Sequence, residues 1–246
     1  MTYCVAMRLD AGLVFCSDSR TSAGVDDVSV YSKMHRFETA ADRCVVLLSA
    51  GNLATTQAVN SQVERDLSNP EITRNLDGFA HLDEAAAYIG ELSSKIQGSY
   101  AEQAEQNGFS ASFILGGRIG DQAPDLFLIY PAGNYIAASR EKPFLQIGET
   151  KYGKPILDRI IEPATTLDRA ARCALISMDA SIRSNLSVGP PIELLLIPAD
   201  ARLEPRYRRF DENDAFLRAL STAWADGLRR LFMELPRFEW EIAESN

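Results

Sequence analysis

The sequence is short of the residues that metal sites and disulfide frameworks need: it has four cysteines and two histidines among 246 residues. Its cysteines stand singly inside apolar stretches, with no CxxC spacing: Cys4, Cys16, Cys44 and Cys173. This pattern predicts reduced, buried thiols. His35 and His81 have no ligand-spaced partner and no GxSxG motif accompanies them, which disfavours a serine–histidine–aspartate hydrolase. We expect neither a metal nor a cofactor.

Basic charge is also scarce. The chain has 25 Lys and Arg against 34 Asp and Glu, a formal net charge of −9 at pH 7. Nucleic-acid binding rests on clustered Lys and Arg that neutralise phosphates, so we expect no nucleic-acid partner. The one basic cluster, Arg206, Arg208 and Arg209, alternates with Tyr207 and is typical of the solvated face of a strand.

Long apolar runs are absent. No stretch of eighteen apolar residues occurs, and the first twenty residues contain turn signals instead of a signal-peptide core. We therefore expect no membrane partner and a cytoplasmic location. No linker rich in Pro, Gly or Ser divides the chain, which predicts a single domain over 1–246 with a C-terminal helix at about 213–235.

What the sequence does contain is an ordered succession of strands and helices. Strand patterns occur at 2–9, 13–20, 28–37, 44–49, 111–118, 126–130, 135–139 and 192–197. Apolar residues at steps of three and four predict helices at 52–67, 82–106, 151–161, 167–184 and 213–235. Runs of strands followed by pairs of helices differ from βαβ alternation and indicate mainly antiparallel sheets. We therefore predict an α+β fold, a four-layer αββα sandwich.

The first two strands decide whether Thr2 and Asp18 meet. If Ala11 is the centre of a three-residue hairpin loop, Thr2 lies opposite Arg20 and Cys4 lies opposite Asp18. Thr2 and Asp18 are then diagonal neighbours on one face, about 7–8 Å apart at the backbone. A two-residue loop would shift the register by one and point them to opposite faces. The face of Asp18 is otherwise apolar, so its carboxylate needs a partner, either Arg20 or Lys33.

Thr2 has chemistry of its own once Met1 is removed, as expected when so small a residue follows the methionine. It then holds both a hydroxyl and a free α-amine, whose unperturbed pKa of about 7.7–8.0 suits a general base. A Lys33 ammonium held by Asp18 would lower the pKa of that amine and favour the oxyanion form of the hydroxyl. Gly51 lies between a strand and a helix, where its N–H is free to bind a developing oxyanion.

Each of these residues also has an ordinary structural interpretation. A threonine in second position is common, and Asp18 with Arg20 or Lys33 is as readily a structural ion pair. Gly51 can be a turn residue. The combination favours catalysis, because the polar residues occur in the order and context that the chemistry requires.

Four stretches together resemble a known family. They are TYCVAMRLDAGLVFCSDSRTSAGVDD near the start, the lysine in VYSKM, the strand-to-helix SAGN and the late SMDASIRSNLSVGPP. They look like the proteasome-type N-terminal nucleophile hydrolases, and most of all like the bacterial Anbu group, sometimes called ancestral β subunits. The similarity runs essentially from end to end.

The resemblance implies roles for individual residues. Thr2 is the nucleophile, Asp18 and Lys33 are its partners, and Gly51 is the oxyanion residue. The family's late aspartate and serine match less closely, and the segment offers three candidates with no register chosen: Asp179, Ser181 and Ser184. The tripeptide Gly148-Glu149-Thr150 stands where the family has a Gly-Ser-Gly loop.

The function expected from these residues is a threonine peptidase or amidase acting on a peptide or amide substrate. No propeptide cleavage is expected, because methionine removal would suffice. Two alternatives remain open: a self-assembling scaffold with little hydrolytic activity, which a retained Met1 would favour, and a hydrolase of small amides or peptide conjugates. The resemblance implies a homo-oligomeric ring or open helical assembly. The chain has no Walker motif, so any ATPase would be a separate partner, which the sequence does not identify.

Overall fold

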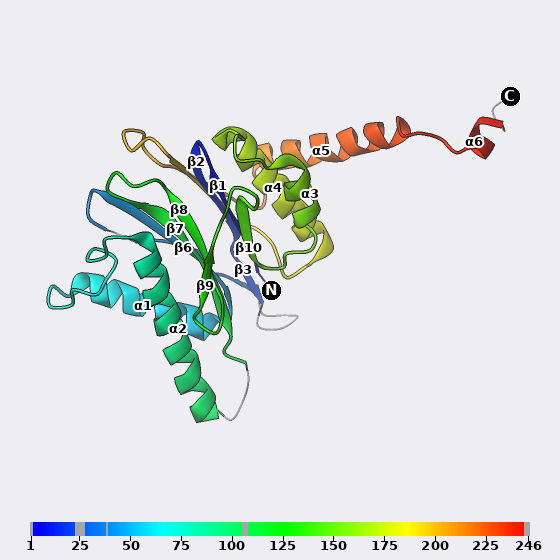
Figure 1. Ribbon diagram of the computed structural model, residues 1–246. Helices are drawn as coiled ribbons and strands as arrows, with labels where there is room; N and C mark the ends of the chain where they lie inside the picture. The colour runs from blue at the N-terminus through cyan, green and yellow to red at the C-terminus, as the bar shows by residue number, and fades with distance from the viewer. Residues whose placement is uncertain (1, 23–27, 38, 105–107, 244–246) are drawn as a thin grey trace. The chain divides into compact units, whose positions relative to one another are not determined.

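The computed structural model describes residues 2–22, 28–37, 39–104 and 108–243 (Figure 1). The chain divides into two units, Met1–Glu212 and Asn213–Asn246. The second unit consists of α5 (Ala215–Met233) and the short α6 (Glu239–Ala243). The single domain over 1–246 stays a prediction.

Two five-stranded antiparallel sheets form the centre of the first unit. The first sheet has the order β10 (Phe144–Gly148), β1 (Tyr3–Leu9), β2 (Gly12–Asp18), β11 (Ile192–Pro198), β12 (Arg206–Phe210). The second has the order β5 (Met34–Arg36), β6 (Arg43–Gly51), β7 (Ala111–Ile119), β8 (Asp125–Ile129), β9 (Tyr135–Ala137). A separate two-stranded ribbon pairs β3 (Arg20–Ser22) with β4 (Val28–Val30).

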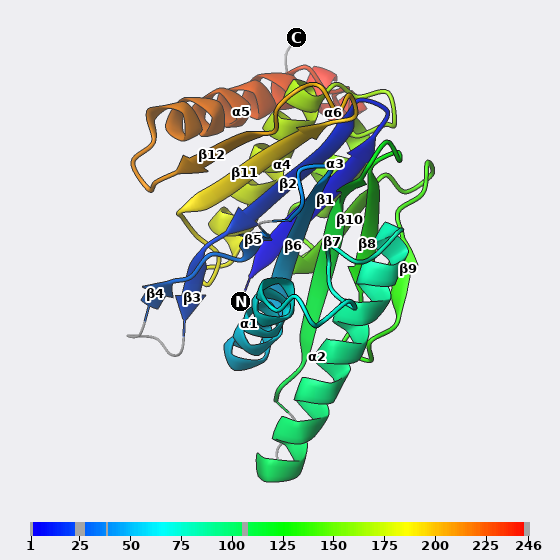
Figure 2. The same ribbon diagram turned by 90° about the vertical axis from the view of Figure 1, so that its left-hand side faces the viewer.

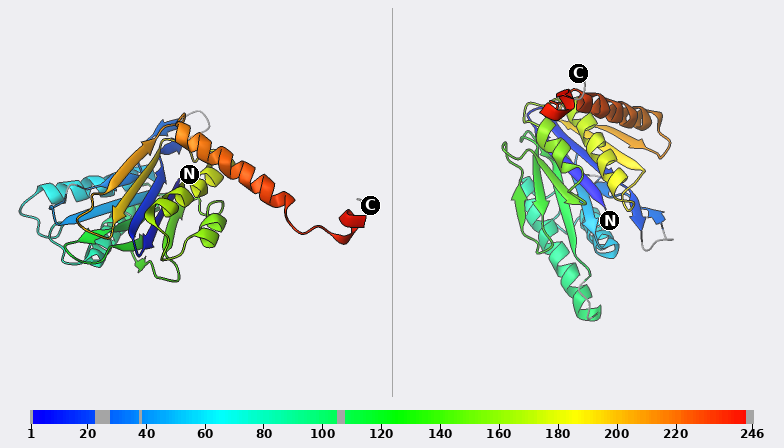
Figure 3. Two further views of the ribbon diagram at one scale, coloured as in Figure 1. Left: turned by 90° about the horizontal axis from the view of Figure 1, so that it is seen from above. Right: turned by 90° about the vertical axis from the view of Figure 1, so that its right-hand side faces the viewer.

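Helices cover the outer face of each sheet. On the second sheet, α1 (Leu53–Ser68) packs on β6 and α2 (Leu82–Ala104) packs on β7 and β8 (Figure 2). On the first sheet, α4 (Leu167–Ser184) packs on β1, β2 and β11, with α3 (Lys154–Ile160) beside it (Figure 3). The predicted four-layer αββα sandwich is confirmed.

The alternation of side chains along a strand builds two cores from the same sheet. In β6, Val46 and Leu48 face the first sheet, where they pack in a buried core with Phe15. The intervening Val45 and Leu47 face α1 and α2 in a second core. Because the central strands are buried on both faces, they read as continuous apolar runs in the sequence.

Several elements are missing from the predicted ranges or are divided differently from them. The strand β10 is short and apolar, without clear alternation, and so gives little strand signal. The strand β12 contains the basic cluster, which the sequence analysis assigned to the solvated face of a strand without giving that strand a range. The segment predicted as one strand over 28–37 is divided into β4 and β5. Its central residues, 31–33, leave the ladder at the point where the polar site forms.

The hairpin between β1 and β2 corrects the predicted register. Leu9 pairs with Gly12 and Cys4 with Ser17, so the loop has two residues rather than three. Gly12 belongs to the strand because β11 approaches its α-carbon closely: a Cβ there would lie 2.1 Å from the carbonyl oxygen of Ile197. The consequence is a one-residue shift, which moves Asp18 to the opposite face from the one predicted.

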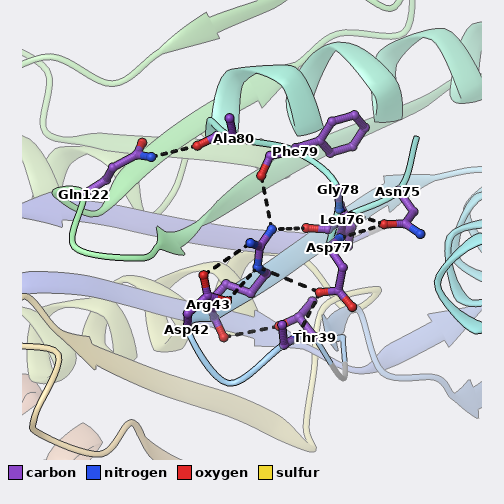
Figure 4. Close-up of polar contacts among 11 residues, drawn as sticks. Thr39, Asp42, Arg43, Asn75, Leu76, Asp77, Gly78, Phe79, Ala80 and Gln122 are labelled. Atoms are coloured by element: carbon purple, nitrogen blue, oxygen red, sulfur yellow. Dashed lines mark hydrogen bonds and ion pairs between the residues drawn. The ribbon is translucent and has the colours of Figure 1, made fainter. Parts of the chain in front are cut away.

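Arg43 ties the loop between α1 and α2 to the start of β6 (Figure 4). Its guanidinium donates to the carbonyl oxygens of Leu76, at 2.9 Å, and Phe79, at 3.1 Å. It also forms an ion pair with Asp42, with Nε and Oδ1 3.0 Å apart. These contacts satisfy loop carbonyls that no helix ladder reaches, and they fix the loop between the two helices against the second sheet.

Among the residues that the structure describes, no helix is long and apolar enough to cross a membrane.

Candidate active site

The centre of the site is a buried ion pair between Asp18, the last residue of β2, and Lys33. Lys33 Nζ lies 2.7 Å from Asp18 Oδ1, and it also donates to the carbonyl oxygen of Arg20 at 2.6 Å. The Asp18 carboxylate accepts two further hydrogen bonds, from the amide of Tyr3 at 3.0 Å and from the amide of Gly189 at 3.2 Å. Both carboxylate oxygens are therefore paired.

Burial sets the electrostatics of this pair. Asp18 has no exposed surface, and this loss of solvent raises its pKa above the ordinary value for aspartate. The ammonium of Lys33 and the two backbone N–H groups oppose that rise. The two charged groups must stay in contact, because either charge without the other would be buried and unpaired.

The structure decides between the two partners proposed for Asp18. Lys33 supplies the ammonium. Arg20 contributes only its backbone carbonyl, while its guanidinium donates to the carbonyl oxygen of Leu186 at 3.1 Å. The division between β2 and β3 at residue 19 explains this difference, since Arg20 pairs with Val30 in the separate ribbon.

Thr2 precedes β1, and the end of β10 holds its backbone. The amide of Glu149 donates to the carbonyl oxygen of Thr2 at 2.6 Å. Gly148, with φ of +82°, pairs with Tyr3, and a Cβ at Gly148 would lie 2.0 Å from the same oxygen. Only glycine allows this approach, so the loop that follows β10 positions Thr2. Met1 lies outside the described residues.

Thr2 and Lys33 line one cavity of about 500 Å³. The hairpin register does not make Thr2 and Asp18 diagonal neighbours on one face of the sheet, as a three-residue loop would have done, although the amide of the adjacent Tyr3 donates to Asp18. Lys33 makes the connection instead, because it bonds Asp18 and also lines the cavity. Ser49 and Gly51, from the end of β6, line the same cavity.

The amide of Gly51 points toward the edge of β6 where the cavity lies. The amide of Asn52 donates to the carbonyl oxygen of Ser110, just before β7, so the preceding amide points to the other edge of the strand. That is the direction of the Ser49 amide, which donates to the carbonyl oxygen of Lys33 at 3.0 Å. Gly51 has φ of +118°, and the helix α1 begins two residues later with Asn52 as its N-cap. A partial positive charge is therefore directed at the region beside Thr2.

The three late candidates lie elsewhere on α4. Asp179 forms an ion pair with Arg183 one turn away, at 2.9 Å, and the hydroxyl of Ser181 donates to the carbonyl oxygen of Ser177 at 3.0 Å. Ser184 is exposed at the end of the helix. None of the three lines the cavity or bonds Asp18 or Lys33. The chain reaches the ion pair only after the helix has ended, through the amide of Gly189.

The sequence analysis did not identify the buried residues that hold the elements of the site together. The phenol of Tyr3 is fully buried and contacts Ser177 Oγ at 2.6 Å and Gln146 Nε2 at 2.7 Å. Glu149 is also buried, and its carboxylate accepts from the side-chain carboxamide of Asn185 at 3.1 Å. These contacts join β1, β10 and α4. The only sequence signal was the quoted NLSVGPP segment, which contains Asn185 and Gly189 but does not show which residues turn inward.

His35 lines the same cavity and is half-buried. Burial lowers its pKa, and the carboxylate of Glu193 opposes the change. Among the described residues, no group of three His, Cys, Asp or Glu side chains is placed to hold a metal. All four cysteines are free, and three of them are buried. Neither His35 nor a thiol is hydrogen-bonded to the Asp18–Lys33 pair.

Comparisons with known proteins agree with the fold. A family model described as "Proteasome subunit" matches residues 2–197. Among solved structures, an Anbu (ancestral beta-subunit) from Yersinia bercovieri is 44% identical, with a TM-score of 0.90 over 97% of this chain and 99% of that one. The helical assembly of the Anbu complex from Pseudomonas aeruginosa gives 41% identity and a TM-score of 0.91, over 96% and 98% of the two chains. A comparison with the curated proteins finds no match.

Proposed function

The chain belongs to the proteasome subunit family, and from that premise we propose that it is a threonine peptidase or amidase whose nucleophile is the Thr2 hydroxyl. Removal of Met1 gives Thr2 a free α-amine, which serves as the general base for its own hydroxyl. The observation that carries the proposal is the meeting of Thr2, Lys33 and Gly51 at one cavity, with Lys33 fixed by the buried Asp18.

The reaction has two halves. In the first, Thr2 Oγ attacks the substrate carbonyl carbon while its proton passes to the α-amine. The C–N bond of the substrate then breaks, the leaving nitrogen takes that proton, and an ester remains on Thr2. In the second half, the amine takes a proton from water as the water oxygen attacks the ester. The carboxylic acid leaves, and Oγ recovers its proton.

Two groups lower the barrier to these steps. The Lys33 ammonium lowers the pKa of the Thr2 amine and of its hydroxyl by placing a positive charge beside them. The Gly51 amide donates a hydrogen bond to the tetrahedral oxyanion, an interaction that strengthens as charge develops on that oxygen. Asp18 acts indirectly: it holds Lys33 in place, and Tyr3 and Gly189 hold Asp18.

The test is covalent capture of Thr2. Intact-mass measurement first shows whether Met1 is absent, and the protein is then incubated with a peptide epoxyketone, which reacts with both groups of an N-terminal threonine. We expect one adduct that peptide mapping places on Thr2, and none in Thr2→Ala. Thr2→Ser should retain labelling. Failure to label Thr2 in protein that has lost Met1 would contradict the proposal.

We also propose that the chain forms a homo-oligomer. The Anbu complex from Pseudomonas aeruginosa is a helical assembly, and its chain matches 96% of this one. The helix α5 carries large apolar side chains, among them Leu228, Leu231 and Phe232. A scaffold with little hydrolytic activity is the second candidate function. The cellular phenotype of Thr2→Ala separates the two, because a phenotype unchanged by this substitution would favour the scaffold. Sedimentation analysis is the control and should show that assembly persists in both the variant and the wild type.

Peptides and small amides are two substrate classes that the same chemistry can cleave. Parallel assays with peptide and small-amide libraries would distinguish a peptidase from a hydrolase of small amides or peptide conjugates. We propose peptides, because a cavity of about 500 Å³ has room for the side chain of a residue as well as for its carbonyl group. Any ATP-driven unfolding of protein substrates would belong to a separate partner, since the chain has no Walker motif.

A further inference from the structure

Glu193, the second residue of β11, is a buried carboxylate that takes no part in the proposed reaction. It is only 5% exposed, and its hydrogen bonds all come from hydroxyl groups. Ser32 and Ser19 donate to Oε2, at 2.6 and 3.3 Å, and Tyr207 donates to Oε1 at 2.7 Å. Within the described ranges the carboxylate has no ion-pair partner. An apolar side chain would fill the same space without the cost of burying a charge, so the role of Glu193 lies in its hydrogen bonds.

Two of the donors are the chain neighbours of the buried ion pair. Ser19 follows Asp18, and Ser32 precedes Lys33. Both hydroxyl groups bond the same oxygen, Oε2 of Glu193, and the bond from Ser32 is much the shorter. One carboxylate of the first sheet therefore connects the two segments that carry the charged groups.

The segment that carries Lys33 depends on contacts of this kind. Residues 31–33 lie between β4 and β5 and belong to neither strand. The amide of Ser49 holds them from one side, because it donates to the carbonyl oxygen of Lys33 at 3.0 Å. The bond from Ser32 to Glu193 holds them from the other. A lysine side chain has four rotatable carbon bonds and high rotamer entropy, so its ammonium keeps one position most readily when the backbone beneath it is fixed.

Glu193 also decides where the Ser32 proton goes. The hydroxyl has one proton and two acceptors, Glu193 Oε2 at 2.6 Å and the carbonyl oxygen of Met34 at 2.9 Å. A carboxylate is the stronger acceptor, and 2.6 Å is typical of a hydroxyl bound to a charged oxygen. Ser32 therefore donates to Glu193, and its oxygen accepts from the amide of Met34 at 3.3 Å. These two bonds close the turn that carries Lys33.

We propose that Glu193 is a positioning residue that acts through Ser32 on Lys33. The fixed backbone places the lysine ammonium against Asp18 and at the cavity beside Thr2. Glu193 does not line that cavity, so it is not placed to touch the substrate. The inference rests on the proposed function only in that the ammonium acts on Thr2, since the placement of the ammonium does not depend on the reaction.

The first test is the rate at which a peptide epoxyketone captures Thr2. In Glu193→Ala we expect the rate at saturating reagent to fall about tenfold or more, while the half-saturating concentration changes less than about twofold. Ser32→Ala breaks the same hydrogen bond and keeps the carboxylate, so it should show the same fall in rate even if Glu193→Ala does not fold. Glu193→Gln should keep most of the rate, because its carboxamide oxygen can accept from both serines while its NH₂ group donates to the Tyr207 oxygen.

Asp66→Ala is the matched control. Asp66 lies on α1, outside the lining of the cavity, and is also a buried carboxylate that accepts from a phenol, that of Tyr88. Its loss should lower stability and leave the capture rate unchanged. An equal fall in rate in Asp66→Ala would assign the effect to stability and overturn the inference. A fall in Glu193→Gln as large as in Glu193→Ala would assign it to charge and also overturn the inference.

Reductive methylation of Lys33 gives a second test that needs no reaction at Thr2. Formaldehyde with cyanoborohydride modifies lysine amines that are accessible and not held in an ion pair, and peptide mapping follows Lys33 against the exposed Lys95. We expect Lys33 to react severalfold faster in Glu193→Ala and Ser32→Ala than in the wild type, Glu193→Gln or Asp66→Ala.

The two tests separate the inference from the proposed function. Faster modification of Lys33 in Glu193→Ala and Ser32→Ala supports the inference even if no variant forms an adduct on Thr2 and the proposed function fails. Capture of Thr2 at the wild-type rate in the folded variants overturns the inference and leaves the proposed function intact. Unchanged modification of Lys33 in Ser32→Ala, with circular dichroism showing a folded chain, overturns it as well.

Discussion

Lys33 Nζ lies 2.7 Å from Asp18 Oδ1, and the two side chains are 8% and 0% exposed. The pair joins two segments that are fifteen residues apart in sequence and lie in different parts of the fold. Asp18 ends a strand of the first sheet, and Lys33 immediately precedes the edge strand of the second. The ion pair can therefore form only when the ends of the two sheets are packed together as they are beside Thr2.

Removing one member of this pair should cost stability as well as activity. Lys33→Met leaves a buried carboxylate unpaired, and we expect the free energy of unfolding to fall by about 3–5 kcal/mol in urea denaturation at pH 7. Asp18→Asn combined with Lys33→Met removes both charges, so the double variant should lose less than the sum of the two single losses. All three variants should lose threonine labelling. Strictly additive losses would show that the two charges are not coupled.

Gly148 should be irreplaceable because the Thr2 carbonyl oxygen lies too close to leave room for a Cβ. Its positive φ alone would not make it so. Gly148 and Gly120 both have positive φ, +82° and +54°, but an alanine Cβ would lie 2.0 Å from the Thr2 carbonyl oxygen at the first and meets nothing within 4 Å at the second. Gly120→Ala should therefore cost only the dihedral strain, about 1–2 kcal/mol, and keep activity. Gly148→Ala should cost more and abolish Thr2 labelling, measured by unfolding and by mass spectrometry. Equal effects on labelling would show that displacement of Thr2 is not the cause.

The sequence was most informative where the signal was local. The helix at 167–184 was predicted with the bounds that α4 has, because its apolar period is regular and its packed face is rich in alanine. The αββα order followed in the same way from runs of strands and pairs of helices. Local patterning failed at the hairpin, where the close approach of β11 to Gly12, far along the chain, decides the loop length.

For the candidate site, too, local sequence signals were informative and long-range contacts could not be predicted. Thr2, Lys33 and Gly51 were named from the sequence, and the structure places all three at one cavity. Lys33 as the partner of Asp18 was one of two options, and only the separation of β3 from β2 decided between them. The supporting contacts of Tyr3 and Glu149 join residues more than thirty positions apart, and nothing in their local sequence indicates them.

His35 should make stability sensitive to pH just below neutrality. Burial places its pKa in the folded chain below the value of about 6.5 expected in the unfolded chain. Between these two values the unfolded chain binds more protons, so stability is fully present above about pH 6.5 and falls as the pH is lowered. Thermal unfolding from pH 7.5 to 5 should therefore show a smaller decrease in Tm for His35→Gln than for the wild type. His81→Gln, at an exposed histidine, is the control; a decrease identical in all three proteins would contradict the assignment to His35.

Phe15 should contribute more to stability than to chemistry, because it fills the space between the two sheets. Its side chain is fully buried, and its ring lies so close to β7 that a Cβ on Gly116 would come within 2.8 Å of Phe15 Cζ. Phe15→Ala leaves a cavity that neighbouring strands can only partly close, and the expected loss is about 3–5 kcal/mol in the free energy of unfolding. Gly116→Ala presses on the Phe15 ring from the other side and also on Leu126, whose Cδ1 would lie 2.7 Å from the new Cβ, and it should cost about 1–3 kcal/mol through overpacking.

The combination of the two substitutions distinguishes packing from a general loss of sheet structure. In the double variant, the Gly116 methyl enters space that the ring has left, so the losses should be less than additive in urea denaturation. Threonine labelling at temperatures well below Tm should persist in Phe15→Ala, since the ring makes no hydrogen bond to Asp18 or Lys33. A loss below 1 kcal/mol in Phe15→Ala would mean that the sheets relax into the space, and that their separation is not fixed by this ring.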